Sequence, residues 1–233
     1  MGEPGPLIGV GRSADVYDVG HGRVLRRYRD AAASAESEAR IMERLAAQDY
    51  PVPAVFDASG PDLVMERLEG PTLLKSVSDR PWTLWSAGAL LADLHLRLHR
   101  IDGTGLTDRQ AGEGSAMLHL DLHPDNVMLT PRGPVVIDWS NAAVGDGAYD
   151  VAYVWMVMVI ATIPGTGIDR VVNPIGRRIL RTSFLRHFDR AQCAAAMVRL
   201  VEEGAVSMRN FDDVERERLR QLVDQLSALA PGG

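Results

Sequence analysis

The residues best suited to chemistry lie close together between positions 119 and 138. The segment begins His-Leu-Asp-Leu-His-Pro-Asp-Asn, and an Ile-Asp-Trp triplet places Asp138 twelve residues after Asn126. Asp121 and Asn126 share a tight loop, and the apolar stretch that ends at Asp138 is expected to pair with residues 127–129. A carboxylate and a carboxamide oxygen suit Mg²⁺, which takes few protein ligands and completes its shell with phosphate and water. A second carboxylate can accept a hydroxyl proton, so the three side chains supply the parts that phosphoryl transfer requires.

This pattern resembles the catalytic loop and the metal-binding aspartate of kinases. The loop sequence, followed by Ile-Asp-Trp rather than Asp-Phe-Gly, is similar to that of the aminoglycoside phosphotransferase and choline kinase-like family. The resemblance covers about residues 7 to 160. The resemblance implies that Asp121 is the catalytic base or orients the hydroxyl group. It also implies that Asn126 and Asp138 hold Mg²⁺ against the phosphates of ATP, and that His119 braces the loop. The alternative is a polar turn in an unrelated α+β protein.

A glycine-containing segment near the N-terminus gains meaning from the same resemblance. Residues 9–16 are similar to the kinase loop that covers the phosphates of the nucleotide, with alanine at the position of the third glycine. Gly9 and Gly11 would let the backbone approach the phosphates closely, so that N–H groups face oxygen atoms. Ser13 is expected to contact a phosphate, and Val16 is expected to pack on the base.

Composition limits which residue can be the phosphate-binding cation, because Lys75 is the only lysine among the 25 Lys and Arg residues. A kinase-like site places a cation on the α- and β-phosphates and holds it by a glutamate of the following helix. In the predicted strand, alternation lets only one of Arg26 and Arg27 face the cleft. We choose Arg26, with Arg27 as the alternative, and Glu38 as its partner. A guanidinium group is planar and larger than an ammonium group. Arginine in place of lysine is therefore expected to affect the efficiency of transfer rather than nucleotide binding.

The resemblance implies further that the adenine base lies at the connector between two lobes. The backbone carbonyl of Glu66 and the backbone N–H of Leu68 would bind its edge. Ordinary strand packing explains the neighbouring apolar residues equally well. Four of them would enclose the ring, namely Ile8, Val16, Met128 and Ile137.

The surrounding sequence supplies the elements that must position these residues. Alternating and helical patterns predict strands at 16–19 and 23–28, a helix at 34–47, strands at 52–57 and 63–68, a helix at 82–100, a loop at 102–116, and helices from about 149 onward. This order indicates an α+β chain of two lobes, and the resemblance implies a protein-kinase-like fold. The expected division is a nucleotide-binding lobe at 1–67 and a catalytic and acceptor-binding lobe at 68–233.

Composition narrows the class of protein. With 46% hydrophobic and 24% charged residues and a net charge of −6, the chain is expected to be globular and a poor binder of nucleic acid. The most apolar run, 151–163, is shorter than the ~18–20 residues that cross a bilayer, and no signal peptide is evident, so we expect a cytoplasmic protein without a membrane partner. The single cysteine, Cys193, favours a buried structural thiol. His95 and His99 have a spacing that can bind a metal, but packing is favoured.

Together these features predict an ATP- and Mg²⁺-dependent phosphotransferase that acts on a hydroxyl group of a small molecule. The family's acceptors include aminoglycosides, choline, homoserine and sugars. The acidic residues at 202–203 and 212–215 favour a cationic acceptor, whereas the arginine-rich segment 168–190 favours an anionic one, and solvated helix faces explain both. The second hypothesis is a nucleotide-binding module with little or no transferase activity, because the usual lysine is missing. A purely structural interaction protein is the third.

Overall fold

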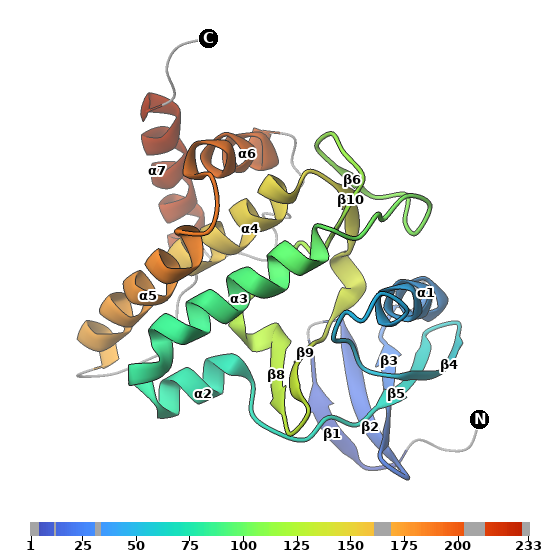
Figure 1. Cartoon of the computed structure of the whole chain (residues 1–233). Coiled ribbons are helices and arrows are strands. Elements are labelled where there is room, and N and C mark those ends of the chain that lie inside the picture. The colour runs from blue at the N-terminus through green and yellow to red at the C-terminus, as the bar shows by residue number, and fades with distance from the viewer. Residues whose placement is uncertain (1–4, 12, 31–33, 161–168, 203–212, 230–233) are drawn as a thin grey trace.

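The computed structural model of the chain has an N-terminal lobe built on one sheet and a larger, mainly helical C-terminal lobe (Figure 1). It describes residues 5–11, 13–30, 34–160, 169–202 and 213–229. The five strands of the first sheet lie in the order β1-β2-β3-β5-β4, and all neighbours are antiparallel. These strands are β1 (Leu7–Val10), β2 (Ala14–Gly20), β3 (Arg23–Tyr28), β4 (Val55–Ser59) and β5 (Asp62–Glu66).

One helix, α1 (Ala35–Ala46), packs against β4 and β5. Its apolar residues recur at helical spacing, and Ala35, Ala39, Met42 and Leu45 are all buried, as their period predicts. The turn between β2 and β3 has positive φ at each of residues 20–22, with values of 76°, 53° and 70°. Glycine at two of the three positions adopts this conformation without steric cost, which fixes the register of the hairpin.

The C-terminal lobe contains six helices among the described residues. They are α2 (Leu73–Asp79), α3 (Leu84–Leu98), α4 (Gly147–Ile160), α5 (Asp169–Leu185), α6 (Arg190–Glu202) and α7 (Asp213–Leu229). The described part of the chain forms two further small sheets. One is the hairpin of β8 (Val127–Thr130) and β9 (Gly133–Val136), and the other joins β6 (Gln110–Ala111), β10 (Ala143–Gly145) and β7 (Ala116–Leu118).

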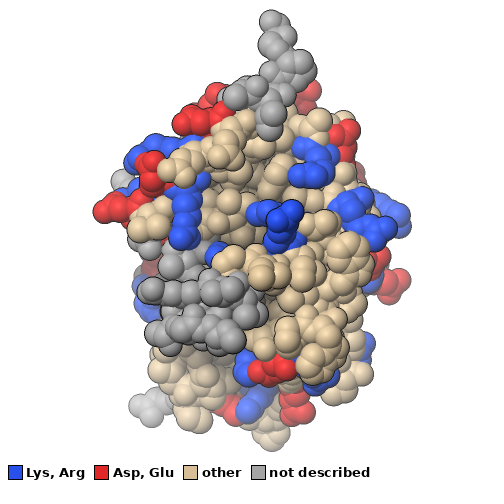
Figure 2. Space-filling view, turned by 90° about the vertical axis from the view of Figure 1, so that its left-hand side faces the viewer, with Lys and Arg blue, Asp and Glu red and all other residues tan. Residues whose placement is uncertain are grey.

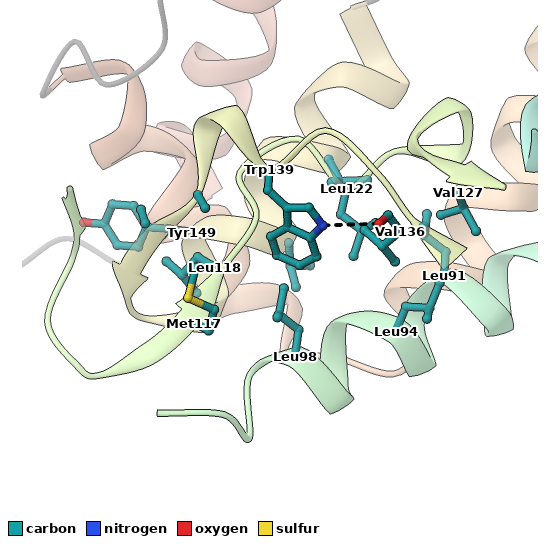
Figure 3. Packing of buried hydrophobic residues seen from close by; sticks show 14 of the residues in the cluster. Leu91, Leu94, Leu98, Met117, Leu118, Leu122, Val127, Val136, Trp139 and Tyr149 are labelled. Carbon is teal, nitrogen blue, oxygen red and sulfur yellow. Dashed lines mark hydrogen bonds between the residues drawn. The ribbon is translucent and has the colours of Figure 1, made fainter. Parts of the chain in front are cut away.

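The core of the C-terminal lobe reaches up to the segment that carries Asp138. The next residue, Trp139, is buried among side chains of α3, β7 and the β8–β9 region (Figure 3). Its indole Nε1–H donates to the Val136 carbonyl at 3.2 Å, and its ring lies 4.5 Å from the imidazole of His119. This packing anchors the backbone on both sides of Asp138 to the core.

Several expected elements differ from the structure in detail. The helix expected at 82–100 begins at Leu84, because Pro81 opens a separate 3₁₀ turn. The segment 102–116, expected as a loop, contains β6 and the first residue of β7, since β6 pairs in parallel with the distant β10. The strand expected from residue 52 begins at Val55, after the two prolines. The apolar run at 151–163 lies in α4 as far as Ile160, and its last three residues fall outside the described part of the chain.

Two further expectations concern single features. Cys193 is buried, and burial, together with the charge of Asp189, raises the pKa of its thiol to about 12. Among the described residues, no helix is both long and apolar enough to cross a bilayer. The proposed lobe boundary between residues 67 and 68 falls in the connector between β5 and α2, and it stays a prediction.

Candidate active site

A cavity of about 470 Å³ lies between the two lobes. Its walls come from β1, β2, β3 and the end of β5 on one side, and from the β8–β9 region on the other. The predicted nucleotide- or metal-binding residues that line it are Ile8, Gly11, Ser13, Val16, Arg26, Glu66, Leu68, Asn126, Met128, Ile137 and Asp138. Most of the residues that the sequence pattern singles out are therefore brought together in one place. Its volume is in the range of small-molecule sites.

Gly9 is not part of the lining. It pairs with Val16 in the sheet, and a Cβ atom at Gly9 would lie 3.6 Å from the Val16 Cβ atom. Gly11 does line the cavity, but its N–H donates to the Ala14 carbonyl at 2.8 Å. Strand pairing places Gly9 in β1, and its predicted approach to the phosphates stays a prediction.

The choice between the two arginines of β3 is clear from their contacts. Arg26 is 7% exposed, and it donates through Nη1 to Glu38 Oε1 at 2.7 Å and through Nη2 to Asp138 Oδ1 at 2.6 Å. Arg27 points the other way and pairs with Asp62 through two hydrogen bonds of 2.6 Å. Burial opposes the charge of Arg26, but Glu38 and Asp138 outweigh it and raise the pKa of Arg26. A permanent cation therefore stands in the cavity.

Glu38 holds this cation from α1. Besides Arg26, its carboxylate accepts hydrogen bonds from the Tyr28 hydroxyl and from the Trp139 N–H, the latter at 3.0 Å. Burial raises the pKa of Glu38, whereas the three donors favour the charged form. The ion pair consequently connects β3, α1 and the segment after Asp138, so that these three elements are fixed together.

Asp138 has a left-handed backbone with φ 66° and ψ 69°, which is uncommon for a residue other than glycine. Its Oδ1 atom accepts from Arg26 and, at 2.7 Å, from the Ser140 hydroxyl. Burial raises the pKa of Asp138, but Arg26 and Ser140 lower this pKa by more than burial raises it, so the net shift is downward. Within the described residues the Oδ2 atom receives no hydrogen bond, and it is the atom left for a cation. Strained backbone of this kind is typical of functional positions.

The catalytic loop presents its groups through internal hydrogen bonds. The Asn126 Nδ2 amide donates to the Asp121 carbonyl at 2.9 Å, which leaves the carboxamide oxygen of Asn126 for a cation. The Asp121 carboxylate does not line the cavity, and its Oδ1 atom lies 3.5 Å from His123 Nε2. Asp125 is exposed and accepts from the Thr72 hydroxyl at 2.8 Å. Asp121 and Asn126 therefore lie on one braced loop, with only Asn126 at the cavity wall.

A buried carboxylate supports this loop from below. Asp150, at the start of α4, accepts from the backbone N–H groups of His119 at 3.1 Å and Leu120 at 2.7 Å, and from His99 Nε2 at 3.0 Å. Burial works against its charge, but the His99 hydrogen bond and nearby imidazoles lower the pKa of Asp150. His119 Nε2 in turn contacts the Ile137 carbonyl at 3.0 Å, next to Asp138. His119 thus has the bracing contact that was expected.

The residues present fit a magnesium ion. Asn126 and Asp138 both line the cavity, and each offers one oxygen atom that its other contacts leave available. Mg²⁺ is commonly held by one or two protein oxygens, with phosphate and water completing its shell. His99 is bonded to Asp150 and His95 packs on Phe184, and the described residues contain no cluster of three or more His, Cys, Asp or Glu side chains that could hold a metal.

Some contributors to the site were not foreseen. Ser140 and Tyr28 hold the two carboxylates that flank Arg26, and Pro53 lines the cavity. Ser140 follows Asp138 by two residues, and this short spacing was the only local signal for it. Tyr28 stands two residues after Arg26 on the same side of β3, so strand alternation could have indicated it.

Two charged segments were expected to influence the choice of acceptor. The arginine-rich segment forms α5 and the beginning of α6, and Figure 2 shows basic side chains across this face with acidic ones mainly toward its edges. Arg186 lies over the ring of Trp85, and Arg190 lies over the ring of Trp155. Of the acidic residues, Glu203 and Asp212 lie outside the described part of the chain. None of the described residues of either segment lines the cavity.

Comparison with known proteins adds a family assignment. The family model of the phosphotransferase enzyme family APH matches residues 5–116 and 106–186. Thiamine kinases of Salmonella paratyphi B and Salmonella newport are 49% identical over 41 residues, which is 18% of this chain and 15% of the kinases. The match to these curated relatives therefore spans less than a fifth of their length.

Solved structures establish the fold. The aminoglycoside phosphotransferase APH(4)-Ia gives a TM-score of 0.65 at 18% identity, covering 97% of this chain and 94% of that one. ADP-bound APH(2″)-Ib gives 0.60 at 14% identity with 96% and 92% coverage, and a choline/ethanolamine kinase family protein from Mesorhizobium loti gives 0.55 at 15% with 98% and 89%. The expected two-lobe, protein-kinase-like α+β fold is confirmed.

Proposed function

The chain belongs to the phosphotransferase enzyme family, and from this premise we propose that it transfers the γ-phosphoryl group of ATP to a hydroxyl group of a small molecule. One observation carries the proposal. Arg26, Asn126 and Asp138 line the same cavity between the lobes, and Asp121 stands on the loop that presents Asn126. A cation, two metal-binding oxygens and a carboxylate base are the groups that phosphoryl transfer uses.

The nucleotide is held by both lobes in this proposal. The base packs between apolar side chains of β1, β2 and the β8–β9 region, and its edge faces the backbone of Glu66 and Leu68. Arg26 neutralises phosphate charge with a fork of donors that matches phosphate oxygens. Asn126 and Asp138 hold Mg²⁺, which supplies a Lewis acid for the phosphate oxygens. Solved relatives bound to ADP or AMP-PNP support a nucleotide in this fold.

Asp121 accepts the proton of the acceptor hydroxyl or orients it. Its side chain is partly exposed, so an acceptor can reach it from solvent. The His123 Nε2 atom lies 3.5 Å from its Oδ1 atom. The chemistry then needs only that the acceptor oxygen and the γ-phosphorus are brought together, since positioning and charge stabilisation dominate this type of reaction.

The acceptor class is a small alcohol. The short match to thiamine kinases and the fold shared with aminoglycoside phosphotransferases support amino alcohols and amino sugars as the first compounds to assay. A panel of thiamine, choline, homoserine, simple sugars and aminoglycosides, read by ADP release, would identify the acceptor.

The decisive variant is Asp121→Asn. It keeps the size of the side chain, so we expect ATP affinity to stay unchanged while kcat falls by about 10²–10⁴-fold. Asp125→Asn is the matched control, because Asp125 lies on the same loop and is exposed, and its side chain bonds only to Thr72 among the described residues. Equal loss of kcat in both variants, or none in Asp121→Asn, would contradict the role of Asp121.

A second candidate is a nucleotide-binding module with little transferase activity. It is favoured by the arginine at the position of the usual lysine, which is bonded directly to the metal-binding Asp138. Under this alternative ATP and Mg²⁺ bind, but no acceptor of the panel accelerates ADP release and Asp121→Asn changes nothing.

A further inference from the structure

A second cavity, of about 390 Å³, lies on the α1 side of the Arg26–Glu38 ion pair. Its walls come from α1, from the segment 105–109 and from the segment 139–142, and it shares no lining residue with the first cavity. Glu38 and Ser140 line it, whereas their hydrogen-bond partners Arg26 and Asp138 line the first cavity. The two cavities therefore lie back to back across one set of ion pairs.

The walls of this second cavity carry two guanidinium groups and several hydroxyl groups. Arg40 belongs to α1, and its Nη2 atom reaches only the Leu106 carbonyl, at 3.4 Å. Arg109 belongs to the other wall, and its Nη1 atom reaches the Ser140 carbonyl at 3.2 Å. Among the described residues neither arginine has a carboxylate within ion-pair distance. The hydroxyl groups are those of Tyr28, Ser34, Ser37, Thr107 and Ser140. Those of Tyr28, Ser34 and Ser140 already donate to carboxylates.

Two carboxylates also belong to the lining, and one of them is already saturated. Glu38 accepts from Arg26, Tyr28 and the Trp139 N–H, so it adds little negative charge to the cavity. Asp108 is exposed, and its single negative charge is outnumbered by the positive charges of the two arginines. The cavity is therefore biased toward anions. Guanidinium forks from α1 and from the segment 105–109 match the oxygen atoms of a phosphate group.

We propose that this second cavity binds the phosphate group of a small molecule through Arg40 and Arg109. The volume exceeds that of a phosphate ion alone, so a small phosphomonoester fits better than inorganic phosphate. Its binding does not require that the chain transfers a phosphoryl group.

Two hydrogen bonds connect the second cavity with the first, one from Arg26 to Glu38 and one from Ser140 to Asp138. A ligand on Ser140 touches the hydroxyl that holds Asp138, and a ligand on α1 touches the helix that holds Arg26 through Glu38. Occupancy of one cavity is therefore expected to change the affinity of the other, and by thermodynamic linkage the factor is the same in both directions.

The test is isothermal titration calorimetry of the full chain with glycerol phosphate and, separately, with inorganic phosphate. A saturating non-hydrolysable ATP analogue occupies the first cavity, and sodium chloride at equal ionic strength controls for screening. We expect saturable binding that weakens at least about tenfold in both Arg40→Ala and Arg109→Ala, because each removes charge-assisted hydrogen bonds. Tighter binding of glycerol phosphate than of inorganic phosphate identifies a phosphomonoester site, and the reverse order identifies a site for the free ion.

Arg44→Ala is the matched control. Arg44 lies one turn further along α1, is exposed and does not line the second cavity, so its replacement removes the same charge from the same helix without touching the site. Binding that is absent at millimolar phosphate, or that is equal in all three variants, would overturn the proposal. Because heat of binding is measured without turnover, these outcomes are independent of whether the chain is a kinase.

Discussion

At the scale of single residues, Arg26 supplies a cation that contacts side chains of both lobes. Its two terminal nitrogens contact carboxylates from two directions, Glu38 at 2.7 Å and Asp138 at 2.6 Å. An ammonium group is a single compact centre, whereas the guanidinium fork presents separated donors in a fixed plane. The arginine therefore joins α1 to Asp138 through one side chain, so this set of ion pairs does not need the single lysine of the chain.

Substitution of Arg26 tests this arrangement. Arg26→Ala leaves Glu38 buried without its cation, so we expect a loss of roughly 3–5 kcal/mol of stability and a fall of several orders of magnitude in transfer. Arg26→Lys keeps one ion pair, so we expect it to restore most of the stability and part of kcat. Chemical denaturation and steady-state kinetics with ATP measure the two effects separately.

Arg27→Ala is the control on the same strand, since it removes a neighbouring arginine that pairs with Asp62 away from the cavity. We expect it to lower stability without changing the KM for ATP. Were Arg27→Ala to abolish transfer while Arg26→Ala left it intact, the assignment of the phosphate-binding cation would move to Arg27.

At the scale of elements, α3 carries a buried imidazole whose charge the fold excludes. His95 is fully buried, its Nδ1 atom contacts the Leu91 carbonyl at 2.8 Å, and its ring packs on Phe184. Burial lowers the pKa of His95 from 6.5 to about 4, although Asp150 works in the other direction. His99 and His119 complete the surroundings of this side chain.

This shift makes stability depend on pH. The unfolded histidine takes up a proton near pH 6.5 and the buried one only near pH 4, so the unfolded state binds more protons in this interval. Stability is therefore full above pH 6.5 and falls as the pH decreases toward 4, by about 3 kcal/mol from His95 alone.

Urea denaturation at half-unit steps of pH measures the slope of stability against pH. His95→Leu should flatten it, His21→Asn at the exposed turn should not, and an unchanged slope in His95→Leu would contradict the prediction.

The elements also show which parts of the structure the sequence could predict. The β2–β3 hairpin and the catalytic loop were predicted because their signals are local, a Gly-His-Gly turn and a set of polar residues at fixed spacing. The contact of Arg26 with Asp138 joins residues 112 positions apart, and β6 pairs with a strand more than thirty residues away. The first contact depends on how the two lobes meet and the second on how the C-terminal lobe folds, and no local pattern encodes either. The second cavity was missed for the same reason, since its walls come from separate segments.

At the scale of the whole molecule, the first cavity lies where the two lobes meet. Its lining comes from the N-terminal sheet and from the β8–β9 region, and the ion pair of Arg26 with Asp138 joins these two sides. A ligand that fills this cavity stabilises the contact between the lobes as well as each lobe. Binding to the folded state alone adds about 2.7 kcal/mol when the ligand is at a hundred times its Kd.

Thermal unfolding with ATP and Mg²⁺ gives the last prediction. For a chain of this size that free energy corresponds to a rise in Tm of roughly 5–10 °C, seen as one transition because the ligand contacts both lobes. Removal of Mg²⁺ with EDTA should lower the rise, since Asn126 and Asp138 then face the phosphates without a cation between them. Asp138→Asn keeps a residue that tolerates the left-handed backbone but removes the charge, so its Tm with ATP should no longer respond to Mg²⁺. A Tm that Mg²⁺ raises equally in Asp138→Asn and in the unaltered chain would place the metal elsewhere, and no rise with ATP at all would remove the nucleotide from this cavity.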